Sequence, residues 1–167
     1  MLKGNLLGMN DSSRIPMFGE KLAGQTYLER PGVYAVIRDA QHRIATLRVG
    51  LAFFLPGGGI APDETPQETL HREIMEECGR AIQIGPDLGK AMEYIYAKNE
   101  RVYYQLRSTF FEAMFMDGQV GPLENDHLLV WLSASKAIEH LQRQSQAWAV
   151  QQLVSSTDEF PGASRES

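Results

Sequence analysis

The sequence has only one cysteine, Cys78, in 167 residues. No intrachain disulfide can therefore form. Nothing in the sequence marks a paired base that would activate this thiol, which argues against a cysteine nucleophile. We expect Cys78 to be a small buried side chain in a protein of a reducing compartment.

Long apolar runs are also missing from the chain. No stretch approaches the roughly 20 apolar residues of a transmembrane helix. The N-terminal segment "MLKGNLLGMNDSSR" has no apolar run long enough for a signal peptide. We therefore expect no membrane partner and a cytoplasmic location.

Basic residues are fewer than acidic ones. The chain has 16 Lys and Arg against 21 Asp and Glu, for a net charge of -5. This balance disfavours a nucleic-acid duplex as the main partner, because phosphate backbones bind basic surfaces. A small anionic substrate remains compatible if a bound divalent cation mediates its binding. The length and the 43% hydrophobic content suit one domain with a full core.

Alternation and turn residues predict how the chain is organised. We expect a flexible arm over residues 1–26, a single domain over 27–155 and a disordered tail over 156–167. Strands are expected at 32–39 and 41–49, paired as a hairpin around "DAQH", and at 51–56, 88–100, 101–115 and 127–133. Two C-terminal helices are expected at 133–144 and 145–156, with N-caps at Ser133 or Ser135 and at Ser145. Strands combined with helices predict an α/β or α+β sandwich around a mixed sheet.

The segment "TPQETLHREIMEECG" predicts a helix with both ends specified. Thr65 and Glu68 are spaced as a capping box, and Pro66 occupies the first helical position, where no N–H is needed. Gly79 suits the left-handed residue that ends a helix. We therefore expect a helix from Pro66 to Cys78.

This predicted helix gathers three carboxylates on one side. At about 100° per residue, Leu70, Ile74 and Cys78 form the core stripe, and the glutamates fall in an arc of about 100° on the other side. The arc contains Glu73, Glu76 and Glu77, with Arg72 at its edge. A solvated face would usually interleave more Lys or Arg with the glutamates. Because hard divalent cations prefer several carboxylate oxygens, a metal site explains the crowding better.

Three glycines, Gly57–Gly59, precede the helix. They allow unusual backbone angles and let a ligand approach the main chain, although a flexible turn would need them too. The spacing excludes the two common phosphate loops, since no Gly-Lys-Ser/Thr follows and no GxGxxG opens directly into a helix.

Together these residues resemble the Nudix box, the signature of the Nudix (MutT-like) hydrolase family. Its fixed positions are occupied here by Gly58, Glu64, Arg72, Glu73, Ile74, Glu76, Glu77 and Gly79. The preceding "FFLPG" resembles the family's aromatic-x-aliphatic-Pro-Gly lead-in. One position departs from the pattern: Arg80 follows Gly79 where the family has a bulky aliphatic, and the next aliphatic is Ile82.

The resemblance implies an α/β/α sandwich that hydrolyses a nucleoside diphosphate linked to a moiety X. It implies that Glu73, Glu76 and Glu77 hold Mg²⁺ or Mn²⁺, with the Gly57 carbonyl as a further ligand. Arg72 would orient the carboxylates through ion pairs and Glu64 would support the loop, with Gly58 beside the substrate and Gly79 ending the helix. Metals of this kind bridge pyrophosphate oxygens and lower the pKa of a bound water.

The identity of the general base stays open. Members of the family differ, and the candidates are Glu73, Glu124 and Asp126, the last two in the "PLENDH" loop, where plain turn chemistry is an equal alternative. Arg48 ends a strand where relatives often carry a phosphate-binding arginine, and an exposed strand residue is the alternative.

Other side chains with ligand chemistry have simpler explanations. His71 and His127 are more often structural than ligating when they stand alone. Tyr96 lies near the place where relatives that hydrolyse diadenosine polyphosphates carry a tyrosine, but packing on the sheet explains it better.

The sequence also leaves the substrate open. Nucleoside triphosphates, dinucleoside polyphosphates and nucleotide sugars all remain candidates, and a homodimer is compatible with the chain. The alternative to an enzyme is a non-catalytic module of the same fold that binds a nucleotide for regulation. A structural protein with a solvated acidic helix would show no stabilisation by Mg²⁺.

Overall fold

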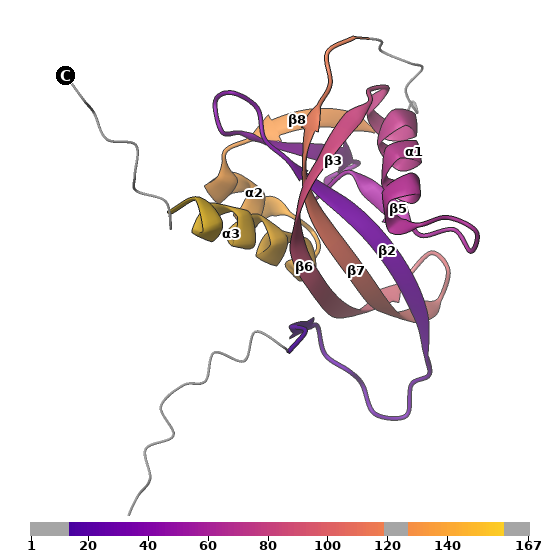
Figure 1. Cartoon of the computed structure of the whole chain (residues 1–167). Coiled ribbons are helices and arrows are strands. Elements are labelled where there is room, and N and C mark those ends of the chain that lie inside the picture. Colours follow the sequence, from indigo (N-terminus) through magenta and orange to yellow (C-terminus); the bar gives the residue numbers. More distant parts are fainter. Residues whose placement is uncertain (1–13, 119–126, 159–167) are drawn as a thin grey trace, which may run out of the picture.

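The computed structural model describes residues 14–118 and 127–158 (Figure 1). Within these ranges, eight strands and three helices follow one another along the chain. They are β1 (Met17–Phe18), β2 (Tyr27–Ile37), β3 (Ile44–Val49), β4 (Ala52–Phe54), β5 (Gly57–Gly59), α1 (Pro66–Cys78), β6 (Ile82–Ala97), β7 (Val102–Phe115), β8 (Leu128–Leu132), α2 (Ala134–His140) and α3 (Gln144–Asp158).

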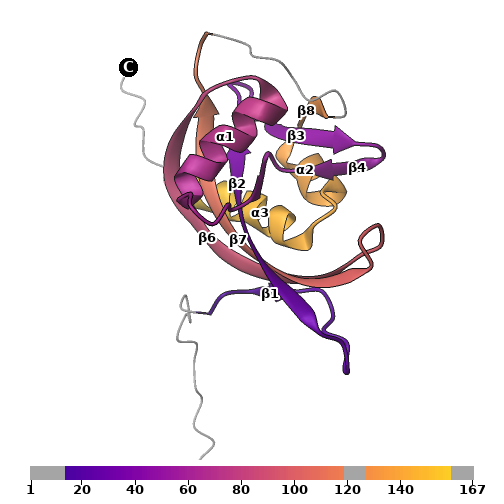
Figure 2. The ribbon, with the colours of Figure 1, turned by 90° about the vertical axis from the view of Figure 1, so that its right-hand side faces the viewer.

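The strands form two sheets. The larger sheet has the order β1-β6-β7-β2-β5, and the smaller one has the order β4-β3-β8. Strand β2 runs parallel to β7 over its whole length and antiparallel to β5, while β6 and β7 form a long antiparallel hairpin. Figure 2 shows this hairpin curving around one side and the lower edge of the domain, with β1 below it. The larger sheet is therefore mixed, as predicted.

Helices cover both faces of the larger sheet, because its strand β2 is apolar on both sides. Val33, Ala35 and Ile37 of β2 pack in one core with the buried stripe of α1. Val36, between them, packs in a second core with α2 and α3. Figure 1 shows α1 on one side of β2 and the other two helices on the opposite side. The predicted α/β/α sandwich is confirmed.

Helix α1 has the predicted ends. The Thr65 side chain accepts the N–H of Glu68, the Glu68 side chain accepts the N–H of Thr65, and Gly79 is left-handed with φ of 64°. Its predicted core stripe is buried, and Cys78 is 4% exposed. Burial raises the pKa of this thiol to about 12, which keeps it protonated at neutral pH.

The predicted hairpin around "DAQH" is wrong in its pairing. The turn is present, because the Asp39 carboxylate accepts the N–H groups of Gln41 and Arg43. The strands it joins enter different sheets, and only one bridge, between Arg38 and Ile44, links them. The physical reason is that both edges of β2 are occupied, one by β7 along its length and the other by β5.

The N-cap prediction holds for one C-terminal helix and fails for the other. Ser133 caps α2 by accepting the N–H of Lys136. Ser145 lies inside α3, whose first N–H groups are accepted by the buried carboxylate of Glu93 from β6. No helix within residues 14–118 and 127–158 is long and apolar enough to cross a membrane.

Candidate active site

The guanidinium of Arg72 organises the carboxylates of α1. Its Nε and Nη2 donate to the two oxygens of Glu64 at 2.8 and 2.9 Å. Its Nη1 donates to Glu73 at 3.0 Å and to Glu76 at 3.4 Å. One cation thus offsets the repulsion between Glu73 and Glu76 of the helix and also binds Glu64, which precedes the helix.

Glu64 is held in its ionised form by this pairing. The hydrogen bonds from Arg72 and from the Thr69 hydroxyl, the latter at 2.6 Å, lower the pKa of the Glu64 carboxyl from 4.5 to about 2. Hydrogen bonds to Glu64 and Glu73 in turn raise the pKa of Arg72 above its usual value. Glu64 therefore anchors Arg72 as a permanent ion pair at the start of α1.

Glu77 is held by a different set of contacts. Its carboxylate accepts the backbone N–H of Gly57 at 3.0 Å, and its other oxygen lies 3.9 Å from His127 Nδ1. The Glu77 side chain is only 11% exposed. These contacts join the helix to β5 and to the residue before β8.

The glycines of β5 are required by the close approach of other atoms. A Cβ on Gly58 would lie 2.6 Å from the carboxylate carbon of Glu73. A Cβ on Gly57 would lie 2.2 Å from the Val33 carbonyl oxygen, and the φ of Gly57 is +139°. Glu73 therefore packs directly against the main chain at Gly58, a close approach that a residue with a side chain would not allow.

The donor set of this face fits a hard divalent cation. Glu73, Glu76 and Glu77 offer only carboxylate oxygens, the ligands that Mg²⁺ and Mn²⁺ prefer. In the part of the chain that the structure describes, no three Asp, Glu, His or Cys side chains, these glutamates included, lie close enough together to hold a metal ion by themselves. Mg²⁺ usually keeps waters and completes its shell with substrate phosphates, so it does not need a full set of protein ligands.

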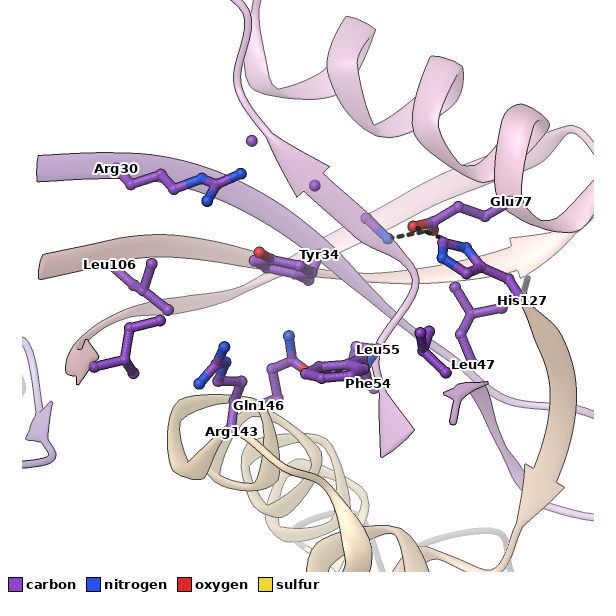
Figure 3. Close-up of a pocket in the computed structure, with 15 residues that line it drawn as sticks. Arg30, Tyr34, Leu47, Phe54, Leu55, Glu77, Leu106, His127, Arg143 and Gln146 are labelled. Carbon is purple, nitrogen blue, oxygen red and sulfur yellow. Dashed lines mark hydrogen bonds and ion pairs between the residues drawn. The ribbon is translucent and has the colours of Figure 1, made fainter. Parts of the chain in front are cut away.

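A cavity of about 250 Å³ opens beside Glu77, while Glu73 and Glu76 are not among the described residues that line it (Figure 3). Both sheets and the start of α3 contribute to its wall, which is lined by Arg30, Tyr34, Leu47, Val49, Phe54, Leu55, Gly57, Gly58, Gly59, Glu77, Ile95, Leu106, His127, Arg143 and Gln146. Glu77 and His127 lie at one end, and Arg30 and Arg143 lie toward the other, beyond the Tyr34 ring. The cavity is thus acidic at one end and basic at the other.

The structure brings together some of the predicted site residues and leaves others apart. Gly57, Gly58 and Glu77 line the cavity, but Arg48 is not among the described residues that do. Arg48 is exposed, and its neighbours Leu47 and Val49 face the cavity instead. Two loop candidates, Glu124 and Asp126, lie outside the described residues.

Two of the weaker candidates lie away from the cavity. Tyr96 is 46% exposed, and its ring packs on Tyr103 with centroids 4.7 Å apart. This is the sheet packing that the sequence favoured for it. His71 is exposed on α1.

The basic end of the cavity was missed from the sequence. Arg30 belongs to β2 and Arg143 immediately precedes α3, and no motif connects them. Tyr34 lies between them: burial raises the pKa of its hydroxyl, while the charges of both arginines lower it. The alternation of β2 places Arg30 and Tyr34 on one face, but only the fold adds Arg143.

Comparison with known proteins gives one family. The model of the NUDIX domain matches residues 28–153. No protein of curated function matches the sequence.

Several solved structures resemble this fold. A MutT protein from Methanosarcina mazei Go1 has a TM-score of 0.62 and 21% identity over 78% of this chain and 96% of its own. The E. coli dihydroneopterin triphosphate pyrophosphohydrolase has 0.61 and 17%, over 79% and 99%. A C. elegans Ap4A hydrolase has 0.60 and 15%, over 80% and 99%. At these identities the likeness establishes the fold alone.

Proposed function

The chain belongs to the NUDIX family, and we propose that it is a divalent-metal-dependent hydrolase of a pyrophosphate bond in a nucleoside diphosphate linked to a moiety X. The observation that carries this proposal is the Arg72 network. One guanidinium binds Glu64, Glu73 and Glu76, next to a glycine that leaves room for the Glu73 carboxylate. A solvated acidic face would not need either the bidentate pair or the glycine.

The proposed roles follow from these contacts. Glu73, Glu76 and Glu77 would hold Mg²⁺ or Mn²⁺, with the Gly57 carbonyl as a further ligand. When bound, the metal would neutralise charge on the pyrophosphate and lower the pKa of a water. Arg72 would orient Glu73 and Glu76 before the metal arrives.

Support for these ligands would come from both ends of α1. Glu64 would fix Arg72 at the start of the helix, and Gly79 would end it after Cys78. The proton of the attacking water would pass to a carboxylate, for which Glu73 and Glu124 are the candidates.

The cavity is the proposed substrate site. Gly58 would meet the diphosphate, and we keep Arg48 as a proposed phosphate contact from the rim. The structures that resemble this fold include a dihydroneopterin triphosphate pyrophosphohydrolase and an Ap4A hydrolase, so the fold does not select X. The proposed setting is a small-molecule nucleotide reaction in the cytoplasm, without a nucleic-acid duplex and compatible with a homodimer.

A hydrolysis assay tests this proposal. Nucleoside triphosphates, ADP-ribose, nucleotide sugars and diadenosine polyphosphates would be incubated with Mg²⁺, with Mn²⁺ and with a chelator, and the products separated by chromatography. Losing an outer-shell partner of a metal reduces activity by up to about 100-fold. Because Glu77 is proposed as a direct ligand, we expect Glu77→Gln to reduce turnover by at least about 100-fold. The matched control is Glu139→Gln, which makes the same change on the exposed face of α2.

Two results would contradict the proposal. One is metal-independent turnover, and the other is equal turnover by Glu77→Gln and the control. Tight nucleotide binding without turnover on any compound would support the non-catalytic module instead.

A further inference from the structure

The basic end of the cavity has the composition of an anion site. Arg30 comes from β2 and Arg143 from the start of α3, so two segments more than 100 residues apart place guanidiniums on one wall (Figure 3). The Tyr34 hydroxyl lies near both guanidiniums, and the charge of each lowers its pKa. Burial keeps this hydroxyl protonated, so it is a neutral donor. Two cations and a hydroxyl donor suit a phosphate group.

Both guanidiniums are oriented by aromatic rings rather than by strong ion pairs. Arg143 lies over the Phe54 ring at 5.8 Å, and Arg30 lies over the Tyr104 ring at 5.2 Å. Within the described ranges, the acidic partner of Arg30 is Glu100 at 3.8 Å, and both side chains of that pair are about half exposed. Such a pair contributes little, so a ligand can displace it. Stacking leaves the N–H edges of a guanidinium available to an oxyanion.

The position of Arg143 is fixed by hydrogen bonds of the three residues that follow it. The Glu93 carboxylate, 5% exposed, accepts the N–H groups of Gln144 and Ser145 and the Ser145 hydroxyl. The Gln146 side chain, three residues after Arg143, accepts the N–H of Leu55 at 2.7 Å. The segment that carries Arg143 is therefore tied both to β6 and to the loop that leads into β5, which gives the basic end a rigid support.

The two ends of the cavity make different demands on a ligand. The carboxylates at the Glu77 end would engage a diphosphate through the metal, whereas the Arg30 end offers positive charge directly. The apolar side chain of Leu106 lines the wall near the basic end (Figure 3). A neutral sugar would leave the two guanidiniums without a counter-charge in the complex, which costs binding free energy.

We propose that the Arg30–Tyr34–Arg143 wall is a subsite for an additional phosphate, so that the preferred substrates are nucleoside diphosphate derivatives carrying at least one phosphate group beyond the diphosphate that is cleaved. This inference rests on the proposed function for the cleaved bond and adds the class of the substrate. Nucleotide sugars whose sugar is uncharged are then poor substrates, and Arg30 and Arg143 determine specificity.

Three matched pairs of compounds test the subsite: NADPH with NADH, coenzyme A with dephospho-coenzyme A, and diadenosine tetraphosphate with diadenosine diphosphate. In each pair the first compound has additional phosphate. We expect the wild type to favour the first compound in kcat/KM by at least about tenfold in one or more pairs, the effect of one charge-assisted hydrogen bond or more. Arg143→Gln and Arg30→Gln should reduce kcat/KM for the first compound of a pair more than for the second, and so abolish that preference.

The control is Arg107→Gln. Arg107 is an arginine of β7 whose side chain is 51% exposed, as is that of Arg30, and it pairs with Glu29 outside the cavity. It should keep the wild-type preference. The proposal is overturned if the wild type shows no preference in any pair, or if the two cavity variants lose both members of a pair equally, since the arginines would then bind the shared diphosphate.

Calorimetric binding of the same pairs separates this proposal from the proposed function. If no compound is hydrolysed but the phosphate-rich members bind more tightly, and Arg143→Gln removes that difference, the subsite stands and the hydrolase does not. If binding also shows no difference within any pair, the subsite is refuted. Melting temperatures of all variants would show that they are folded.

Discussion

The three consecutive glycines of β5 allow a graded test of the site, because an added methyl group meets a different neighbour at each position. On Gly58 the new Cβ would lie 2.6 Å from the Glu73 carboxylate carbon. On Gly57 it would lie 2.2 Å from the Val33 carbonyl oxygen. On Gly59 its nearest neighbours are 3.8 Å away or more.

The magnitudes follow from these distances. Ordinary carbon–carbon contacts are about 3.5–4.0 Å, so Gly58→Ala must push the Glu73 carboxylate back by about 1 Å. The end of a flexible side chain can turn away at a cost of about 1 kcal/mol, but a shift of about 1 Å in an active site can reduce turnover on the order of 100-fold. Gly57→Ala meets main-chain atoms at a φ of +139° and should destabilise the fold by about 3 kcal/mol or more.

The assay pairs turnover with urea unfolding for the three variants. Gly58→Ala should be nearly as stable as the wild type and about 100-fold less active. Gly57→Ala should lose stability, and Gly59→Ala should change the free energy of unfolding by less than about 1 kcal/mol and keep its activity. Wild-type activity in Gly58→Ala would refute the placement of Glu73 in the catalytic machinery. A loss of stability as large as that of Gly57→Ala would refute the claim that only a flexible side chain must move.

Three further predictions concern the supports of the site. Glu93→Ala removes a buried carboxylate that accepts three hydrogen bonds at the start of α3. It should lower the free energy of unfolding by about 3 kcal/mol. A change near zero would show that these hydrogen bonds do not stabilise the start of α3. Gln146→Leu leaves the N–H of Leu55 without its acceptor and should cost about 1–3 kcal/mol in the same unfolding experiment, whereas an unchanged midpoint would contradict the bond's importance. The pKa of the Glu64 carboxyl is lowered from 4.5 to about 2, so its ionised form stabilises the fold above pH 4.5 and this contribution disappears as the pH falls toward 2. In Glu64→Gln that part of the stability curve should flatten, and an unaltered curve would exclude Glu64 as its source.

Local chemistry made the helix of the site predictable. The capping box, the proline at its first position and the glycine at its end all lie within the segment they define, so α1 has the expected bounds. The carboxylate arc follows from the helical period alone. The contacts of Arg72 with Glu73 and Glu76 lie within one turn and were accessible for the same reason.

Contacts between distant segments were not predictable in the same way. A turn at Asp39 suggests a hairpin, but the choice of β7 as the partner of β2 depends on residues about 75 positions away. The cap of α3 comes from Glu93, about 50 residues earlier, so Ser145 was the wrong choice. Arg143 has no local motif, and its place in the cavity depends on how α3 packs against the sheet.

Metal binding tests the central claim most directly. Mn²⁺ would be titrated into the wild type, Glu77→Gln and the control Glu139→Gln, with free Mn²⁺ followed by its paramagnetic resonance signal. If the glutamates of α1 hold the metal, the wild type and the control bind Mn²⁺ equally and Glu77→Gln binds at least about tenfold more weakly. Equal binding by all three proteins, or none by the wild type, would contradict the assignment of these carboxylates as metal ligands.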